Sequence, residues 1–259
     1  HYLEHLLFKG TSEFGTKGYH AEKAYLDRIE NLYEIYALQK DSLSRKQVYK
    51  MIDSFSYMAS KISIANEYDK LMSGIGATGT NAYTSFDETV YVNAIPSNSV
   101  EKWIKIEADR FRDPVFRLFH TELEAVYEEK NISMDDDYNL GFEALFKALF
   151  PNHPYGTQTT IGTVEHLKNP SIKEIIELIN DQFGTWLSSP QALNGPAIPV
   201  QDLEKRVVTV QGPKPAMLMM AFPFNNPRNT DENLKLKLID LLLSNSVAGL
   251  IDLNIVKSQ

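Results

Sequence analysis

Three residues at the start of the sequence have types and spacing suited to metal chemistry. His1 and His5 are four residues apart, and Glu4 lies between them in the stretch HYLEHLLFKGT. Residues four apart share one face of a helix, so both imidazoles could bind one Zn²⁺. A carboxylate beside that ion can take a proton from its water, which would make Glu4 the general base and then the general acid. The HxxEH order is the reverse of the HExxH zinc motif.

A catalytic zinc site also needs a third protein ligand and one open position. The chain has no cysteine, so this ligand must be a histidine or a carboxylate. In the helix-forming stretch FHTELEAVYEEKNISMDDD, Glu122 and Glu129 share one face, and Glu124 and Glu128 share another. Spacing alone leaves the choice open among these four glutamates and the other histidines, which are His20, His120, His153 and His166.

Composition narrows the class of protein that carries these residues. The chain has 259 residues, of which 43% are hydrophobic, so it can bury a substantial core. Its net charge of -8 argues against a nucleic-acid partner or an anionic membrane surface. No apolar run approaches the ~20 residues that span a bilayer. The sequence begins with His rather than Met, so we expect the natural N-terminus to lie upstream and the chain to be a fragment.

Helical periodicity predicts most of the elements that must position the candidate ligands. We expect helices over residues 1–8, 98–112 and 120–149, a helix after Ser171, and a helix over 231–245. The polar segment 21–72 predicts a helical hairpin, either a solvated addition to the domain or a surface for a partner. Alternating β-forming residues predict strands within 74–96, and further strands over 206–211 and 216–222.

Four ordered motifs resemble those of the pitrilysin/insulinase (M16) family of zinc metallopeptidases, which are inverted zincins and include the mitochondrial processing peptidases. HYLEHLLFKGT looks like the zinc helix of the family, and GTNAYTSFDETVYV like one of its strands. ELEAVYEEKN looks like its second metal helix, and HPYGTQTTIGT like a loop that follows it. The resemblance covers roughly residues 1–186.

The resemblance implies a role for each candidate residue. One zinc per chain would be held by His1, His5 and Glu129, with Glu4 as general base. Glu122 would support a histidine ligand from behind. An edge strand containing Asn81, Ala82, Tyr83 and Thr84 would bind extended substrate through backbone hydrogen bonds. The implied activity is endopeptidase hydrolysis of peptides or unfolded polypeptides, and the alternative is a non-catalytic subunit or scaffold that partners an active peptidase.

The resemblance also implies an architecture. We expect an α+β fold in which a mostly antiparallel sheet has helices packed on one side. This fold would form a catalytic domain over 1–186 with an insertion at 21–72, and a linker over 187–205 would follow. A second, incomplete copy that lacks the zinc motif would span 206–259. A homodimer or a heterodimer with a related subunit, and a periplasmic or exported location, are further expectations.

The sequence departs from the family in three places. No strands precede His1, the insertion is longer than in compact members, and a long segment of the family is absent between Ile175 and Ile176. We therefore expect residues to be missing at that junction.

Overall fold

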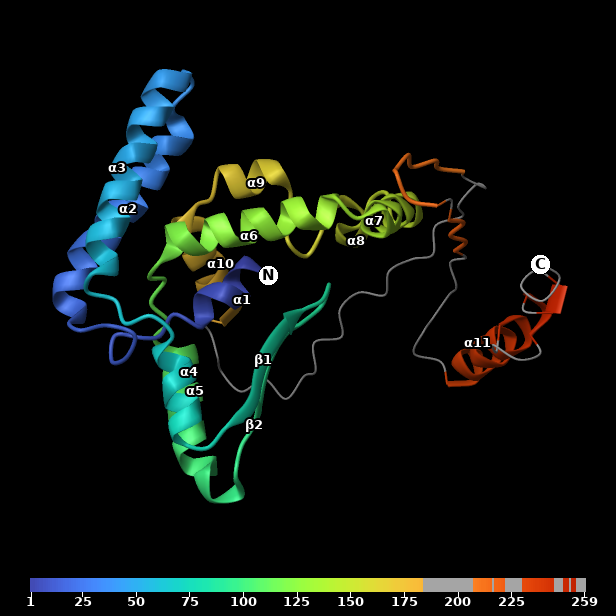
Figure 1. Ribbon diagram of the computed structural model, residues 1–259, viewed down its shortest axis with the longest axis horizontal. Coiled ribbons are helices and arrows are strands. Elements are labelled where there is room, and N and C mark those ends of the chain that lie inside the picture. The colour runs from blue at the N-terminus through green and yellow to red at the C-terminus, as the bar shows by residue number, and fades with distance from the viewer. Residues whose placement is uncertain (184–206, 216, 222–229, 245–248, 252, 255–259) are drawn as a thin grey trace. The chain divides into compact units, whose positions relative to one another are not determined.

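The computed structural model describes residues 1–183, 207–215, 217–221, 230–244, 249–251 and 253–254. The chain divides into two compact units (Figure 1). The first comprises His1–Leu187 and Thr209–Pro215, and the second comprises Ser188–Val208 and Ala216–Gln259. In the second unit the longest described element is the helix α11, Thr230–Leu243. The candidate ligands all lie in the first unit.

Helices make up most of the first unit. Before the sheet these are α1 Tyr2–Leu7, α2 Tyr19–Leu38, α3 Ser42–Ser60 and α4 Glu67–Gly74. The strands β1 Thr78–Thr84 and β2 Thr89–Ala94 follow, and then a 3-10 turn at Ser97–Ser99. The remaining helices are α5 Val100–Arg112, α6 Phe119–Met134, α7 Asp137–Leu149, α8 Pro154–Thr157, α9 Val164–Lys168 and α10 Ile172–Phe183.

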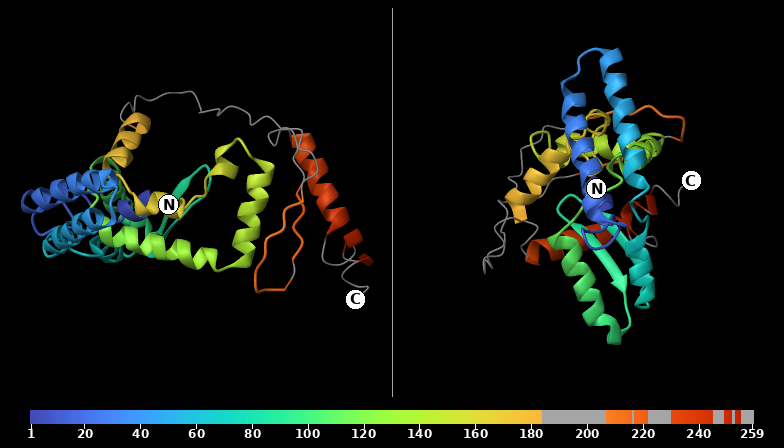
Figure 2. Two further views of the ribbon diagram at one scale, coloured as in Figure 1. Left: turned by 90° about the horizontal axis from the view of Figure 1, so that it is seen from above. Right: turned by 90° about the vertical axis from the view of Figure 1, so that its left-hand side faces the viewer.

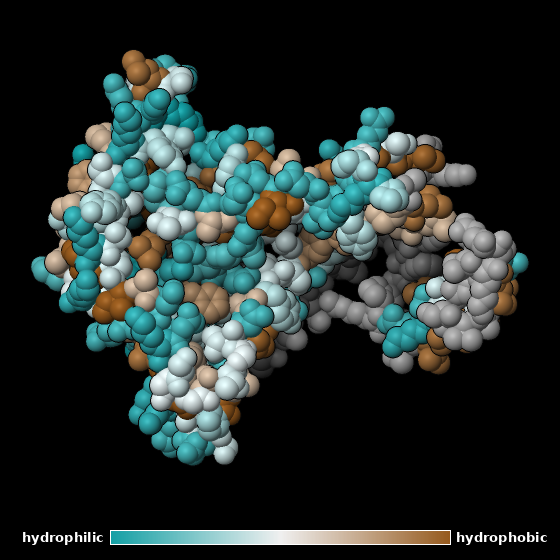
Figure 3. Space-filling view, in the orientation of Figure 1, coloured by the Kyte–Doolittle hydropathy of each residue, from teal (hydrophilic) through white to brown (hydrophobic). Residues whose placement is uncertain are grey.

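Helices α2 and α3 form the hairpin expected from the sequence (Figures 1 and 2). Asp41 ends the connection and caps α3, since its carboxylate accepts a hydrogen bond of 2.8 Å from the Ser44 amide. The hairpin occupies 19–60 rather than 21–72, and the separate helix α4 follows it. The face of the hairpin that is turned toward the viewer in Figure 3 is mainly hydrophilic.

The inner face of the hairpin belongs to the core of the first unit, so the hairpin is more than a solvated addition. The core joins one residue of α1 to α2, α3 and α6, and α9 and α10 close it at one side. Its buried members are Leu6, Ile29, Leu32, Tyr33, Val48, Ile52, Ala59, Phe119, Leu123, Val126, Leu167 and Ile172. Because α1 and α6 both contribute, the same packing that forms the core sets the two candidate metal helices side by side.

Strands β1 and β2 pair antiparallel, with Asn81 opposite Val92 and Thr84 opposite Thr89. The register shifts between Thr78 and Asn81, beside Gly79 in the left-handed region at φ 65°. Helices α1 and α4 pack against β1. The α+β class is confirmed, and within the described residues the sheet has these two strands.

Two expectations about elements are wrong. The single helix expected over 120–149 is two helices, because the chain turns at Asp135 and the Asp136 side chain caps α7 by accepting from the Tyr138 amide at 2.8 Å. The strands expected over 206–211 and 216–222 are not formed by the residues described there, 207–215 and 217–221.

Three further expectations concern the linker, the junction at Ile175 and Ile176, and membrane-spanning segments. The linker expected over 187–205 lies outside the described residues. Ile175 and Ile176, between which we expect residues to be missing, are consecutive residues of α10. Among the described helices, none has the length and apolar character needed to cross a bilayer.

Candidate metal centre

The first turn of the chain places two imidazoles together. His1 precedes α1, and its carbonyl accepts from the His5 amide at 3.2 Å, so both residues lie on one helical turn. Their Nε2 atoms are 3.3 Å apart. Leu6, on another face of the same helix, is fully buried in the core and fixes the rotation of α1.

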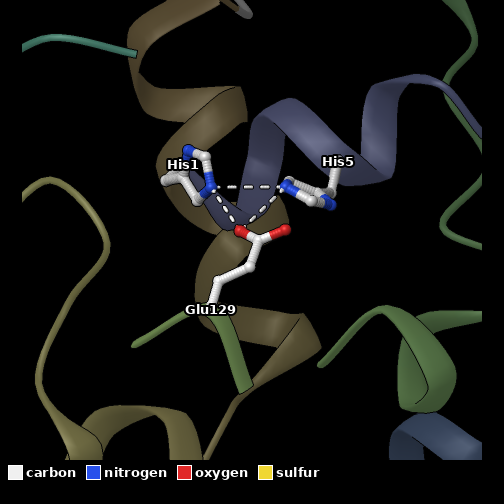
Figure 4. Close-up of side chains that lie close together, drawn as sticks. All are labelled: His1, His5 and Glu129. Atoms are coloured by element: carbon white, nitrogen blue, oxygen red, sulfur yellow. Dashed lines mark hydrogen bonds and ion pairs between the residues drawn. The ribbon is translucent and has the colours of Figure 1, made fainter. Parts of the chain in front are cut away.

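The carboxylate of Glu129 reaches this pair from α6 (Figure 4). Its Oε2 lies 3.0 Å from Nε2 of His1 and 3.6 Å from Nε2 of His5. Two ligand atoms at 2.0–2.1 Å from a tetrahedral zinc ion would be about 3.3 Å apart. The three separations bracket that value, so the donor set and its spacing fit zinc. Within the described residues this is the group of histidines and carboxylates close enough to hold a metal ion.

Glu4 lies beside the proposed ligands and is buried, with 6% of its surface exposed. Its Oε2 accepts a hydrogen bond of 2.5 Å from the Thr84 hydroxyl and lies 3.3 Å from Nδ1 of His1. The backbone carbonyl of Glu4 accepts from the Tyr91 hydroxyl at 3.2 Å. Strands β1 and β2 therefore hold both ends of the residue expected to act as the base.

Glu122 lies on the same face of α6 as Glu129, seven residues earlier, and contacts the far side of His5. Its Oε2 is 3.3 Å from Nδ1 of His5, and its Oε1 is 2.6 Å from Nζ of Lys9. The hydrogen bond that His5 donates to Glu122 raises the pKa of His5, with Glu129 and Glu4 adding to the effect, although burial opposes it. Burial would raise the pKa of Glu122, but the hydrogen bonds from His5 and Lys9 outweigh it and lower that pKa. An Nδ1–H held by a carboxylate leaves the Nε2 lone pair free to face a metal.

Lys9 is the contact that sequence reasoning missed. It follows His5 by four residues, the spacing that shares a helical face, so the same rule that paired the histidines could have found it.

The other candidate ligands lie away from this cluster. Nδ1 of His120 is buried against the Tyr33 hydroxyl at 2.7 Å. His153 caps α8, while His20 and His166 are exposed. Glu124 accepts from the Tyr49 hydroxyl at 3.1 Å, and Glu128 accepts from Asn131.

The four residues expected to meet substrate alternate along β1. Ala82 and Thr84 are half-buried, whereas Asn81 and Tyr83 are exposed. The Thr84 hydroxyl donates a hydrogen bond to Glu4, so the Thr84 side chain contacts the proposed base. A cavity of about 240 Å³ lies between α1, α4 and β1, and its walls include Glu4, His5, Asn81 and Ala82. Within the described residues β1 pairs with β2 alone, which leaves its other edge without a strand.

The loop that follows α1 is held by a buried arginine. Arg117 donates to the carbonyls of Lys9 and Thr11, each at 2.7 Å, and to Phe14 at 3.1 Å. Its Nε pairs with Glu22 of α2 at 3.1 Å, and both side chains are almost fully buried. Gly10 has φ 96°, and a Cβ there would lie 2.4 Å from the Phe14 carbonyl. Residues 9–11, which end the HYLEHLLFKGT motif, thus hold the C-terminal end of α1 in place.

Two family models match the chain. Residues 50–163 match the model described as insulinase (peptidase family M16), a range that includes β1, Glu122 and Glu129 and begins after His1–His5. Residues 169–259 match the model described as the peptidase M16 inactive domain. The chain matches no curated protein.

Proposed function

Since the chain belongs to the insulinase family of peptidases, M16, we propose that it is a zinc-dependent endopeptidase acting on peptides or unfolded polypeptides. The observation that carries the proposal is the meeting of His1, His5 and Glu129 next to the buried carboxylate of Glu4. His1 immediately precedes α1, His5 belongs to it and Glu129 comes from α6. Because 45% of the Glu129 side chain is exposed, a ligand can reach the cluster from solvent.

The proposed chemistry divides between a bound ion and the residues of the chain. Zinc, held by one carboxylate and two imidazoles, would polarise the scissile carbonyl and lower the pKa of the attacking water toward ~7. Glu4 accepts the proton of that water as it adds to the carbonyl carbon. Glu4 then gives the proton to the amide nitrogen as the C–N bond breaks, which releases an amine and a carboxylic acid. The Thr84 hydroxyl orients the carboxylate for both transfers.

Substrate is proposed to add as a strand to the free edge of β1. Backbone hydrogen bonds to Asn81–Thr84 would hold an extended peptide with limited regard to its sequence, which suits unfolded polypeptides. The adjoining cavity could take a substrate side chain next to Glu4.

Replacing Glu4 by Gln tests the mechanism. The amide cannot accept a proton from water, so Glu4→Gln should lower kcat for an unstructured peptide by about 10²–10⁴-fold. Zinc content, measured by atomic emission, should stay near one ion per chain. The matched control is Glu128→Gln, an exposed Glu beside Glu129, which should keep the parent rate. Cleavage by Glu4→Gln at the parent rate would sink the mechanism.

A second candidate is a non-catalytic subunit or scaffold that partners an active related peptidase. The match of residues 169–259 to the inactive type of M16 domain fits this candidate, and it fits the first equally, because a second domain without the zinc motif is also expected of an active chain. A parent chain that binds zinc yet cleaves no peptide, and that raises the rate of an added active M16 peptidase, would support this candidate over the first.

A further inference from the structure

Arg110 is buried in the first unit, and no step of the proposed reaction uses it. None of its surface is exposed. Its Nη2 pairs with Glu107, whereas Nε and Nη1 have no hydrogen-bond acceptor among the described residues. A buried cation with unsatisfied donors destabilises a fold unless other contacts offset the loss of water.

Four aromatic rings provide those contacts. We call them the Arg110 cage. The guanidinium carbon lies 5.6 Å from the ring centre of Phe8, 4.8 Å from Tyr68, 4.3 Å from Tyr91 and 4.5 Å from Phe111. At these distances each ring attracts the cation through its electron-rich face. The rings come from the C-terminal end of α1, from α4, from β2 and from α5. One side chain thus ties four elements together.

Tyr91 of the cage contacts the proposed base, and Phe8 lies about one helical turn after it. Phe8 follows Glu4 by four residues and so lies on the same side of the turn. Tyr91 donates its hydroxyl to the Glu4 carbonyl and sits opposite Ala82 in the β1–β2 register. The metal ligands have separate support, because Leu6 packs in the core and Tyr2 donates to the Phe119 carbonyl of α6 at 2.7 Å. The cage therefore determines the packing of α1 against the sheet more than the packing of α1 against α6.

We propose that Arg110 is a positioning residue that fixes α1 against β2, and so sets Glu4 relative to the substrate strand β1. Its kinetic consequence rests on the proposed peptidase function, whereas its structural consequence does not.

Amide hydrogen exchange on the zinc-free full chain tests the structural part. The variant is Glu107→Gln with Arg110→Met, which removes the cation without leaving a buried unpaired carboxylate. Exchange in α1 and β2 should accelerate by about tenfold or more, while α2 and α3 keep the parent rates. Arg110→Lys, which keeps a cation in the cage, should recover most of the protection. Arg112→Met, the exposed arginine two residues on, is the matched control and should change nothing.

The exchange results decide the structural claim in every case. Unchanged rates in α1 and β2 would overturn it, and so would equal acceleration in α2 and α3, which would mean general destabilisation. If the double variant does not fold, the single variant Tyr91→Leu takes its place, because it removes one ring of the Arg110 cage. It should accelerate exchange in α1 and β2 by more than Tyr91→Phe, which keeps the ring and removes the hydroxyl alone.

Kinetics test the consequence for Glu4. In the double variant kcat should fall by about 10–10²-fold, because small displacements of a catalytic group are costly, while KM and zinc affinity stay within about threefold. Arg110→Lys should recover kcat. A parent chain that cleaves no peptide would refute the proposed function and leave the exchange result standing. A parent that cleaves, with a double variant of equal kcat, would refute the positioning role.

Discussion

Glu122 influences the metal centre through a residue that it contacts rather than through the metal itself. Its carboxylate holds Nδ1 of His5, and Lys9 neutralises its other oxygen. In the metal-free protein this contact is the largest cause of the raised pKa of His5. A protonated imidazole cannot ligate zinc, so protons and zinc compete for His5.

The pH dependence of zinc binding follows from the sign of that shift. Because the pKa of His5 is raised from 6.5, zinc affinity should begin to fall at a higher pH than an ordinary imidazole would cause. Replacing Glu122 by Gln removes the anionic partner and lowers the pKa of His5, so the midpoint of zinc loss should move to lower pH. Affinity at pH 8 should fall by about 10–100-fold, since the ring is no longer oriented.

Competition titrations with a fluorescent zinc chelator from pH 5 to 8 measure both effects. Glu128→Gln removes a carboxylate of the same helix without touching His5 and should leave the midpoint in place. A midpoint that is the same in Glu122→Gln and the parent would contradict the coupling.

At the scale of residues, the sequence allowed part of this site to be predicted. Helical spacing alone paired His1 with His5 and put Glu122 and Glu129 on one face, and the structure brings these four residues together. Selecting Glu129 over Glu124 required the resemblance, because spacing treats both as members of a charged helix. The Arg110 cage escaped prediction, since its rings come from four elements whose packing no local pattern encodes.

At the scale of elements, the conformation of the loop after α1 is fixed both by a buried arginine and by two glycines. Arg117 fills the space beside Gly10 and Gly15, and both glycines have a positive φ that other residues rarely adopt. A Cβ on Gly10 would also lie 2.9 Å from Nη1 of Arg117.

Gly10→Ala should therefore destabilise the first unit by about 1–3 kcal/mol, through backbone strain and displacement of Arg117. Urea denaturation measures the change. Gly74→Ala is the control, because Gly74 ends α4 with open space around it and Ala is the better helix former. If Gly10→Ala lowered the free energy of unfolding no more than Gly74→Ala, the loop would tolerate a side chain at Gly10.

Elements were predictable where one pattern dominates. The hairpin carries apolar residues at helical spacing and a capping Asp41, and its start was predicted closely. Its end was placed too late, because the separate helix α4 was counted as part of it. The break between α6 and α7 was missed because helix-forming residues run on both sides of it. The capping residue Asp136 lies in a run of aspartates, and its sequence context is equally consistent with a solvated surface charge.

At the scale of the whole molecule, the proposed metal joins segments far apart in the sequence. His1 and His5 open the chain, whereas Glu129 lies beyond the hairpin, the sheet and α5. A ligand that binds only the folded state stabilises it in proportion to the logarithm of its concentration over Kd.

Zinc removal should thus lower stability by about 2.7 kcal/mol relative to protein with free zinc at 100 times Kd. Urea denaturation with and without a chelator measures this difference. In Glu129→Ala the difference should shrink markedly, while Glu128→Ala should retain it. Equal stabilisation of Glu129→Ala and the parent would place the metal elsewhere.

The alternation along β1 has a consequence for how this protein could diversify. Thr84 is committed to the carboxylate that performs the proposed proton transfers, and Ala82 faces the same way. Asn81 and Tyr83 are exposed, and among the described residues neither makes a hydrogen bond to the base or to the metal ligands. Mutation at alternate positions of one strand can therefore explore new substrates while the positions between them keep the chemistry intact. Specificity and catalysis would evolve separately although they share seven consecutive residues.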